Sequence, residues 1–199
     1  MFDPDGPVLG VDPGLTRCGY GAVRAGAPGP AAVGFGILRT DPADELPHRL
    51  AMLHADLRAL LADVAPSALA VERLLFQHNV RTAVAVGQAS GVVLAAAAEA
   101  GVPVTHYSPN EVKLAIAGDG AADKAQVQHM VARVLHLDAR PEPPDAADAL
   151  ALALCHAWRA PLREAVVAAM PTPRDGPRDG ARDALGAAIE RALAREDAS

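Results

Sequence analysis

The order of strand-like and helix-like segments constrains the fold of this chain more than any other feature of its sequence. Three apolar runs, "PVLGVD", "CGYGAVRA" and "AAVGFGILRT", come first, and clusters of Gly and Pro separate them. This spacing predicts three consecutive antiparallel strands. Helical patterns then alternate with two short apolar runs, "SALAVE" and "VPVTHYS". Such alternation is typical of β-α units, so we expect an α/β fold, a five-stranded mixed sheet with helices on both faces.

Apolar spacing and end signals mark the predicted helices. Leucines recur at helical spacing between residues 46 and 66, and a long helix over about 80–100 is expected to end at Gly101. Ser108 with Glu111, and farther along Asp123, are the residues expected to cap two more helices. The run "RPEPP" precedes the last core helix, "DAADALALALCHAW".

The composition changes after Trp158. We expect one domain over residues 1–160, a Pro- and Gly-rich linker over 161–183, and a short tail helix or disordered segment over 184–199. Leu185, Ile189 and Leu193 lie at helical spacing in this tail, but so short a helix is marginal alone in water.

Bulk properties narrow the class of protein. Two cysteines, Cys18 and Cys155, cannot form a disulfide framework and fit a reducing compartment. The start of the chain does not resemble a secretory leader, and "VVLAAAA", the seven-residue run within the most apolar window, is too short to span a bilayer. We therefore expect a cytoplasmic protein without a membrane partner. A formal charge of −6 argues mildly against nucleic-acid binding, although carboxylates that hold metal ions would not repel DNA.

Four acidic residues stand at the ends of apolar strands or at the start of a helix. Asp12 and Glu72 end apolar strands, and Asp145 and Asp148 lie three residues apart at a helix start, on nearly the same helix face. Asp12 fits a turn residue or a metal ligand, and the aspartate pair fits helix caps or metal ligands. Glu72 has no capping role to fill. If the four converge, their oxygen-only chemistry suits Mg²⁺ or Mn²⁺.

Lysine usage is a second unusual feature. Of the 18 basic residues only Lys113 and Lys124 are lysines, and the rest are arginines. A lysine kept in so Arg-rich a chain suggests a position that needs a compact, mobile ammonium group instead of a guanidinium fork.

Five segments together make the chain resemble the RuvC family of Holliday-junction resolvases. They are "GVDPGLTRCGYG", "AVERLLFQHN", "VGQASGVV", "EVKLAIAGDGAADKAQVQHMV" and "DAADALALALCH", and the resemblance runs from about Val8 to Trp158. It implies an RNase H-like fold, a homodimer, and paired metal-dependent nicking of four-way junction DNA. It also implies two Mg²⁺ ions per active site, with Mn²⁺ as a substitute, and partnership with the RuvA-RuvB branch-migration complex.

The resemblance assigns roles to particular residues. The catalytic metal ligands fall on Asp12, Glu72, Asp145 and Asp148, and the basic residues near the scissile phosphate fall on Lys113 and Lys124. The family often has an aromatic wedge three residues after its catalytic Glu, where this chain has Leu75 followed by Phe76. We expect Phe76 to wedge into the junction with Leu75 bracing it. The alternatives are that Leu75 is the wedge, or that both residues only pack within the loop.

Residues that follow Glu72 are candidates for DNA contact, with a solvated loop as the competing interpretation: Arg73, Leu75, Phe76, Gln77, His78, Asn79 and Arg81. In the next helix a stripe of small residues suits close packing, either on the chain's own sheet or against a second copy: Ala83, Gly87, Gly91 and Ala95.

Other functions fit the sequence less well. A related RNase H-like nuclease with another nucleic-acid substrate is the main alternative, and a catalytically inactive junction-binding protein is disfavoured because all four acids are present. The "DPGLT" turn could also cradle phosphate in an actin-like ATPase, but that fold needs a duplicated domain, for which 199 residues are too few.

Overall fold

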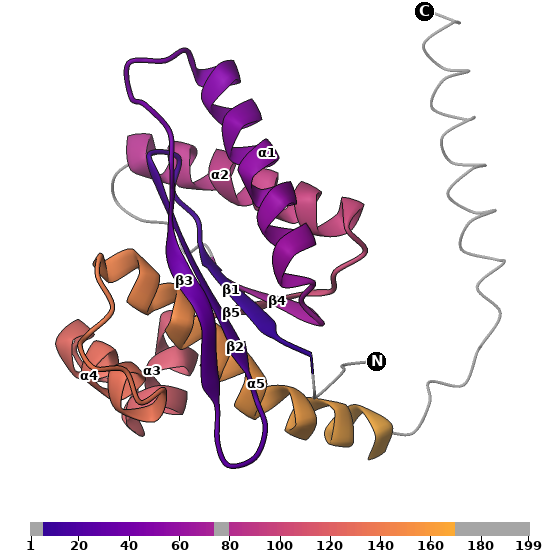
Figure 1. The fold of residues 1–199 in the computed structure, drawn as a ribbon, viewed down its shortest axis with the longest axis vertical. Coiled ribbons are helices and arrows are strands. Elements are labelled where there is room, and N and C mark those ends of the chain that lie inside the picture. Colours follow the sequence, from indigo (N-terminus) through magenta and orange to yellow (C-terminus); the bar gives the residue numbers. More distant parts are fainter. Residues whose placement is uncertain (1–5, 74–79, 170–199) are drawn as a thin grey trace, which may run out of the picture. The chain divides into compact units, whose positions relative to one another are not determined.

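The computed structural model describes residues 6–73 and 80–169, with side chains for 6–73 and 83–160. The strands are β1 (Val8–Asp12), β2 (Arg17–Arg24), β3 (Ala31–Arg39), β4 (Ala68–Glu72) and β5 (Val104–Tyr107). The helices are α1 (Leu46–Val64), α2 (Val80–Glu99), α3 (Pro109–Ala117), α4 (Lys124–Val134) and α5 (Pro144–Ala169) (Figure 1).

The five strands form one mixed sheet in the order β3-β2-β1-β4-β5. β1 and β3 both pair antiparallel with β2, whereas β4 pairs parallel with both β1 and β5. The predicted antiparallel start, followed by parallel β-α units, is therefore confirmed. As a result β1 and β4 lie side by side at the sheet centre, and their carboxyl ends, at Asp12 and Glu72, point the same way.

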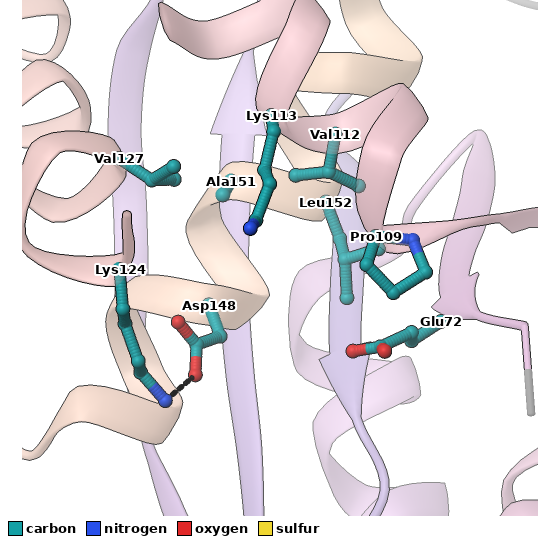
Figure 2. A pocket seen from close by; sticks show the side chains of 9 residues that line it. All are labelled: Glu72, Pro109, Val112, Lys113, Lys124, Val127, Asp148, Ala151 and Leu152. Carbon is teal, nitrogen blue, oxygen red and sulfur yellow. Dashed lines mark ion pairs between the residues drawn. The ribbon is translucent and has the colours of Figure 1, made fainter. Parts of the chain in front are cut away.

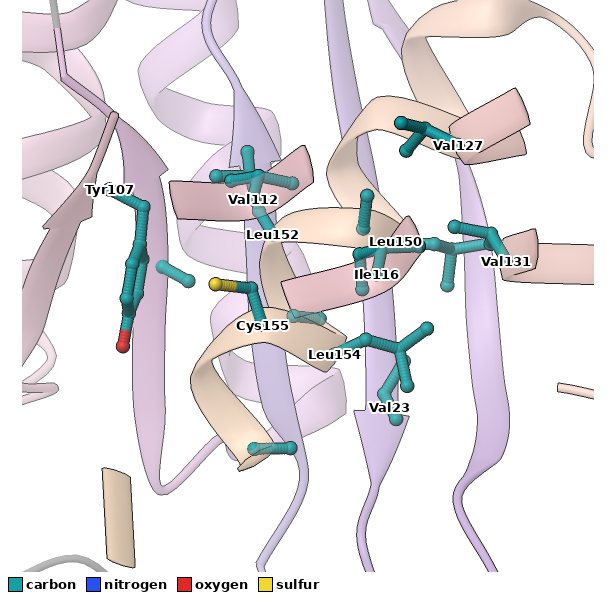
Figure 3. Close-up of a cluster of buried hydrophobic side chains, with 14 of the residues drawn as sticks. Val23, Tyr107, Val112, Ile116, Val127, Val131, Leu150, Leu152, Leu154 and Cys155 are labelled. Carbon is teal, nitrogen blue, oxygen red and sulfur yellow. The ribbon is translucent and has the colours of Figure 1, made fainter. Parts of the chain in front are cut away.

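Helices cover both faces of the sheet, and each face has its own apolar core (Figure 1). On one face α5, with α3 and α4, packs Leu150 and Leu154 against strand residues such as Val8 and Val23 (Figure 3). On the other face α1 and α2 pack against Leu9 and the alternate strand residues that accompany it. Because side chains alternate along a strand, the core to which one strand residue belongs shows which of its neighbours also face α5.

The predicted helix starts are confirmed by hydrogen bonds. The Ser108 hydroxyl accepts from the backbone N–H of Glu111, whose carboxylate in turn accepts from the backbone N–H of Ser108. Asp123 and Gln126 form the same reciprocal pair at the start of α4. These two capping boxes fix where α3 and α4 begin, and so where Lys113 and Lys124 stand.

The last helix is longer than the sequence suggested. α5 continues to Ala169, eleven residues past Trp158, where we expected the core helix to end. The extension "LREAVVAA" after Pro161 consists mostly of residues that favour helix, and this outweighs the single backbone hydrogen bond that Pro161 cannot donate.

The chain divides into two compact units, residues 1–164 and 165–199. The first unit holds the whole sheet. In the second the structure describes only the end of α5, so the predicted linker and tail helix lie largely outside the described residues and stay predictions. No helix within the described residues has the length and apolar character needed to cross a membrane.

Candidate active site

Three charged residues share the sheet face that α5 covers, all at the same end of the sheet. Alternation along β1 puts Asp12 on the same side as Val8, which packs on α5, and alternation along β4 puts Glu72 on the side of Ala70. Arg17, the first residue of β2, lies on the side of Val23 by the same rule. Each of these charged residues lies at a strand end, where the strand leaves the core, and the three therefore come together at one end of the sheet.

Glycines on this face let α5 lie against the sheet backbone. A Cβ atom on Gly10 would stand 1.9 Å from the carbonyl oxygen of Ala149, and one on Gly19 would stand 2.2 Å from that of Asp145. Side chains at these positions are therefore excluded, and the first turns of α5 approach the strands closely. This approach brings Asp145 and Asp148 to the ends of β1 and β2.

The aspartates meet in one cluster. A carboxylate oxygen from each of Asp12, Asp145 and Asp148 lies within 4.8 Å of the others. Burial, together with the neighbouring carboxylates of Asp148, Glu72 and Asp145, raises the pKa of Asp12 from 3.8 to about 7. Crowded carboxylates repel one another unless a cation lies among them, and hard oxygen ligands suit a divalent ion such as Mg²⁺. The donor set thus fits a metal ion.

Glu72 adjoins this cluster across a cavity. The cavity has a volume of about 220 Å³, and its lining includes Glu72, Asp148, Lys113 and Lys124. Figure 2 shows the Glu72 carboxylate and the Lys113 ammonium group extending toward the space between them, whereas the Asp148 carboxylate is turned toward Lys124. Burial, and then the charge of Asp148, raises the pKa of Glu72, with Lys124 opposing the shift. Both lysines of the chain thus come from α3 and α4 to the edge of the acid cluster.

Lys124 is bound to one of the acids. Its ammonium nitrogen lies 2.5 Å from Oδ2 of Asp148, although 60% of its side chain is exposed (Figure 2). Gln128, one turn farther along α4, also hydrogen-bonds to Asp148. Burial raises the pKa of Asp148 because it outweighs both partners. For Lys124 burial acts the other way, and the hydrogen bond to Asp148 overcomes it, so that the lysine pKa is raised.

Arg17 is a charged neighbour that sequence reasoning missed. Its Nη2 lies 2.7 Å from Oδ2 of Asp145, and its Nε donates to the same oxygen at 2.9 Å. The signal was present in "RCGYG", because Arg17 and the two glycines that follow alternate onto one strand face. Without the helix that this face supports, nothing in the sequence connected Arg17 to Asp145.

The turn that carries Asp12 into β2 is held from α1 and the end of β3. A Cβ on Gly14 would stand 2.2 Å from the carbonyl oxygen of Arg17, so the turn needs glycine there. The buried Thr40 hydroxyl donates to the carbonyl oxygen of Leu15 at 2.5 Å. Arg49 donates to the hydroxyls of Thr40 and Thr16, at 3.0 and 2.7 Å. These contacts fix the backbone between Asp12 and Arg17.

The candidate DNA-contact residues after Glu72 are mostly outside this description. Arg73 is exposed beyond the end of β4, and its backbone N–H donates to the carbonyl oxygen of Tyr107 at 2.7 Å. Arg81 lies in the first turn of α2, and its side chain is not described. The other predicted contacts lie outside the described residues: Leu75, Phe76, Gln77, His78 and Asn79.

The sheet and its acid cluster define a class of protein. Aspartates at the end of a central strand and on a facing helix, with two lysines at the cavity edge, suit metal-assisted hydrolysis of a phosphodiester bond. Among known families, the model of crossover junction endodeoxyribonuclease RuvC matches residues 8–156. This chain belongs to the RuvC family of endonucleases.

Individual relatives agree with the family match. RuvC of Salinispora arenicola is 53% identical over 171 residues, which are 85% of this chain and 97% of that protein. RuvC of Leifsonia xyli is 47% identical over 194 residues, which cover 94% of this chain and 93% of the relative. Both are crossover junction endodeoxyribonucleases by name.

Solved structures confirm the predicted RNase H-like fold. Thermus thermophilus RuvC in complex with Holliday junction substrate is 41% identical, with a TM-score of 0.75 over 79% of this chain and 96% of that one. The yeast mitochondrial Holliday junction resolvase Ydc2 is 16% identical, with a TM-score of 0.59 over 82% of this chain and 85% of that one, and it supports the fold alone.

Proposed function

We propose that this endonuclease resolves Holliday junctions by paired, metal-dependent hydrolytic nicks in DNA recombination and repair. The observation that carries the proposal is the cluster of Asp12, Asp145 and Asp148, built on the fold of a family whose Thermus thermophilus member is solved with junction substrate. Paired nicks in strands of like polarity leave ends that a ligase can seal.

Asp12, Glu72, Asp145 and Asp148 are the residues we propose to hold the metal, two Mg²⁺ ions per site with Mn²⁺ as a substitute. Two such ions supply charge stabilisation for both the attacking and the leaving oxygen of a phosphoryl displacement. The carboxylates supply hard oxygen ligands, and the glycine-seated start of α5 holds two of them against the end of β1. Because Asp12 is partly buried, its carboxylate would attract a bound cation more strongly than an exposed carboxylate would.

The lysines would act on the phosphate itself. A phosphate group that enters the cavity would meet Lys113 and Lys124, which line it across from Glu72 (Figure 2). An ammonium group preorganised at that place stabilises negative charge that develops on the phosphate oxygens. Because Lys124 is exposed and touches Asp148 at a single oxygen, it can leave that carboxylate for the phosphate without disturbing α4.

The loop after Glu72 belongs to the same proposal as the DNA-contact segment, with Phe76 as the wedge that opens the junction centre and Leu75 bracing it. Stacking on an aromatic ring is worth about 1–3 kcal/mol per base, more than an aliphatic side chain supplies. Phe76→Ala should fail on an intact junction and be rescued by one with unpaired central bases, whereas Leu75→Ala should not. Equal defects of Phe76→Ala on both substrates would indicate loop packing.

Assembly is a further part of the proposal. A four-way junction needs two symmetric cuts, which a homodimer supplies from two equivalent sites. The small-residue stripe of α2 supports this, because Gly91 and Ala95 are exposed, whereas Ala89, Val93 and their helical neighbours pack on the sheet. Packing on the chain's own sheet, the other use that the sequence left open for the stripe, does not fit this exposure. We further propose that the protein acts in the cytoplasm, where chromosomal junctions form, and that it works beside a RuvA-RuvB complex.

A direct test incubates the full chain with a synthetic mobile four-way junction and with a linear duplex of matched sequence, each with and without Mg²⁺. We expect symmetric nicks in the junction only when Mg²⁺ is present, products that ligase seals, and little cutting of the duplex. Asp12→Asn serves as the control for a contaminating nuclease. Equal cutting of duplex and junction, or cutting of another nucleic acid instead, would favour the related nuclease with a different substrate.

A further inference from the structure

We propose that Arg17 is a positioning residue, whose guanidinium group fixes the Asp145 carboxylate in the orientation that binds a divalent cation. The inference rests on the proposed metal-dependent function and adds to it a residue that the expected set of acids and lysines does not contain.

The contact itself is specific in geometry. Nη2 and Nε of Arg17 both reach Oδ2 of Asp145, at 2.7 and 2.9 Å. Two donors of one planar group hold that oxygen in place more closely than a single ammonium contact would. Neither contact engages Oδ1, so Arg17 can hold one oxygen while the other serves as a ligand.

Both ends of the Arg17 side chain are anchored. At its root, Arg17 follows Thr16, whose hydroxyl accepts from Arg49 Nη2 at 2.7 Å, and it begins β2, the strand in which Gly19 lies against the backbone of Asp145. At its tip, the guanidinium group meets the carboxylate at the first turn of α5. The backbone contact at Gly19 fixes where the residue Asp145 lies, and the arginine contact fixes how its carboxylate is turned.

The aspartate pair thus has two different cations. Lys124 touches Asp148 through one nitrogen, from the first turn of α4. Arg17 touches Asp145 through two nitrogens, from a strand end in the sheet that also carries Asp12. The ammonium group of Lys124, on a mobile side chain, suits a cation that later moves to the phosphate. The guanidinium group of Arg17, on a strand, suits a cation that stays on its carboxylate.

Exposure decides what the contact can be for. The side chains of Arg17 and Asp145 are 41% and 31% exposed, and ion pairs so open to water add little to folding stability. A role in metal binding has no such limit, because loss of a partner that orients a metal ligand typically lowers metal affinity or activity about 10–100-fold.

The opposite role is a cation that merely neutralises the acid cluster when metal is absent. Such a competitor lowers metal affinity, so its removal would tighten binding. The sign of the change in affinity therefore separates positioning from competition.

The test measures Mn²⁺ binding to the DNA-free full chain, by electron paramagnetic resonance of unbound Mn²⁺, for the wild type, Arg17→Ala and Arg17→Lys. Arg39→Ala is the matched control, since Arg39 pairs with Arg17 across the sheet and its removal deletes the same charge one strand farther from the acids. The same variants are compared in an Asp145→Asn background, and thermal unfolding in EDTA checks the fold.

We expect Arg17→Ala to weaken Mn²⁺ binding on the order of 10–100-fold while Arg39→Ala changes little. Arg17→Lys should recover only part, because it keeps the charge but not the fork, and Arg17→Ala should have no further effect beside Asp145→Asn. Unchanged or tighter binding by folded Arg17→Ala, or full recovery by Lys, would overturn the inference. Failure of the wild type to bind Mn²⁺ would instead count against the proposed function.

Discussion

Gly19→Ala is the perturbation that most directly tests how the fold builds the site. Gly19 pairs with Asp12 across β1 and β2, and it faces the backbone of Asp145 at the start of α5. One methyl group there removes no charge and no proposed ligand. It acts only on the distance between the helix that carries two acids and the strand that carries the third.

The structure sets the size of the effect. The new Cβ would lie 2.2 Å from the carbonyl oxygen of Asp145 and 3.1 Å from its Cβ. Close carbon–oxygen contacts in proteins are about 3.3–3.6 Å, so the first turn of α5 must move away by about 1 Å. A misplacement of about 1 Å can lower a catalytic rate on the order of 10²-fold. Overpacking of this kind destabilises a fold by about 1–3 kcal/mol.

The assay is single-turnover nicking of a mobile four-way junction at saturating Mg²⁺, with thermal unfolding measured in parallel. Gly34→Ala is the matched control, because Gly34 lies in the neighbouring strand β3 and a Cβ there would meet nothing within 4 Å. We expect a loss of about two orders of magnitude for Gly19→Ala in protein that is still folded, and a rate near wild type for Gly34→Ala. Wild-type nicking by Gly19→Ala would refute the argument that close seating of α5 aligns the acids.

Three other predictions concern the charged groups. Four amide variants of the acids should each abolish nicking yet retain junction binding in a gel-shift assay: Asp12→Asn, Glu72→Gln, Asp145→Asn and Asp148→Asn. Near-normal nicking by any one of them would show that the residue is not a metal ligand. Lys113→Ala and Lys124→Ala should each slow nicking by roughly 10²–10³-fold. Lys113→Arg and Lys124→Arg should not restore the full rate, and full activity of both would show that any cation suffices. Because the pKa of Asp12 is raised from 3.8 to about 7, the folded protein retains a proton that the unfolded chain has released between these values. This group's contribution to stability is therefore lost as the pH rises from about 4 to about 7, and urea unfolding in EDTA should show a shallower pH dependence for Asp12→Asn than for the wild type.

Much of the fold was encoded locally. The Gly- and Pro-separated strands, the alternation of short apolar strands with helices, and the capping boxes at Ser108 and Asp123 depend on residues close in sequence, and all are confirmed. Asp12 and Glu72 were conspicuous for the same reason, since a carboxylate that ends an apolar strand can be recognised without knowing its neighbours. The two lysines were conspicuous only against the arginine-rich composition of the chain.

Local sequence misled where several tendencies competed. The change of composition after Trp158 suggested that the last core helix ends there, yet the helix-favouring residues that follow carry α5 to Ala169. For the stripe of small residues on α2 the sequence left two uses open, and packing on the chain's own sheet is the one that the structure does not support. Ala89, Val93, Ala96 and Ala97 of the same helix pack on the sheet instead, and because three of these four are alanines, side-chain size does not separate the two faces of α2.

Only the tertiary structure decided which charges meet. Arg17 and Asp145 are 128 residues apart, and their contact exists because glycines on β1 and β2 let α5 lie against the strand backbone. No periodicity or cap records such a contact, since it depends on the register of β1 with β2 and on the depth at which a helix sits. The sequence by itself determined that acids stand at strand and helix ends, because those ends can be recognised from the apolar runs next to them. Close packing between distant segments determined that three of those acids share one site and that an arginine holds one of them.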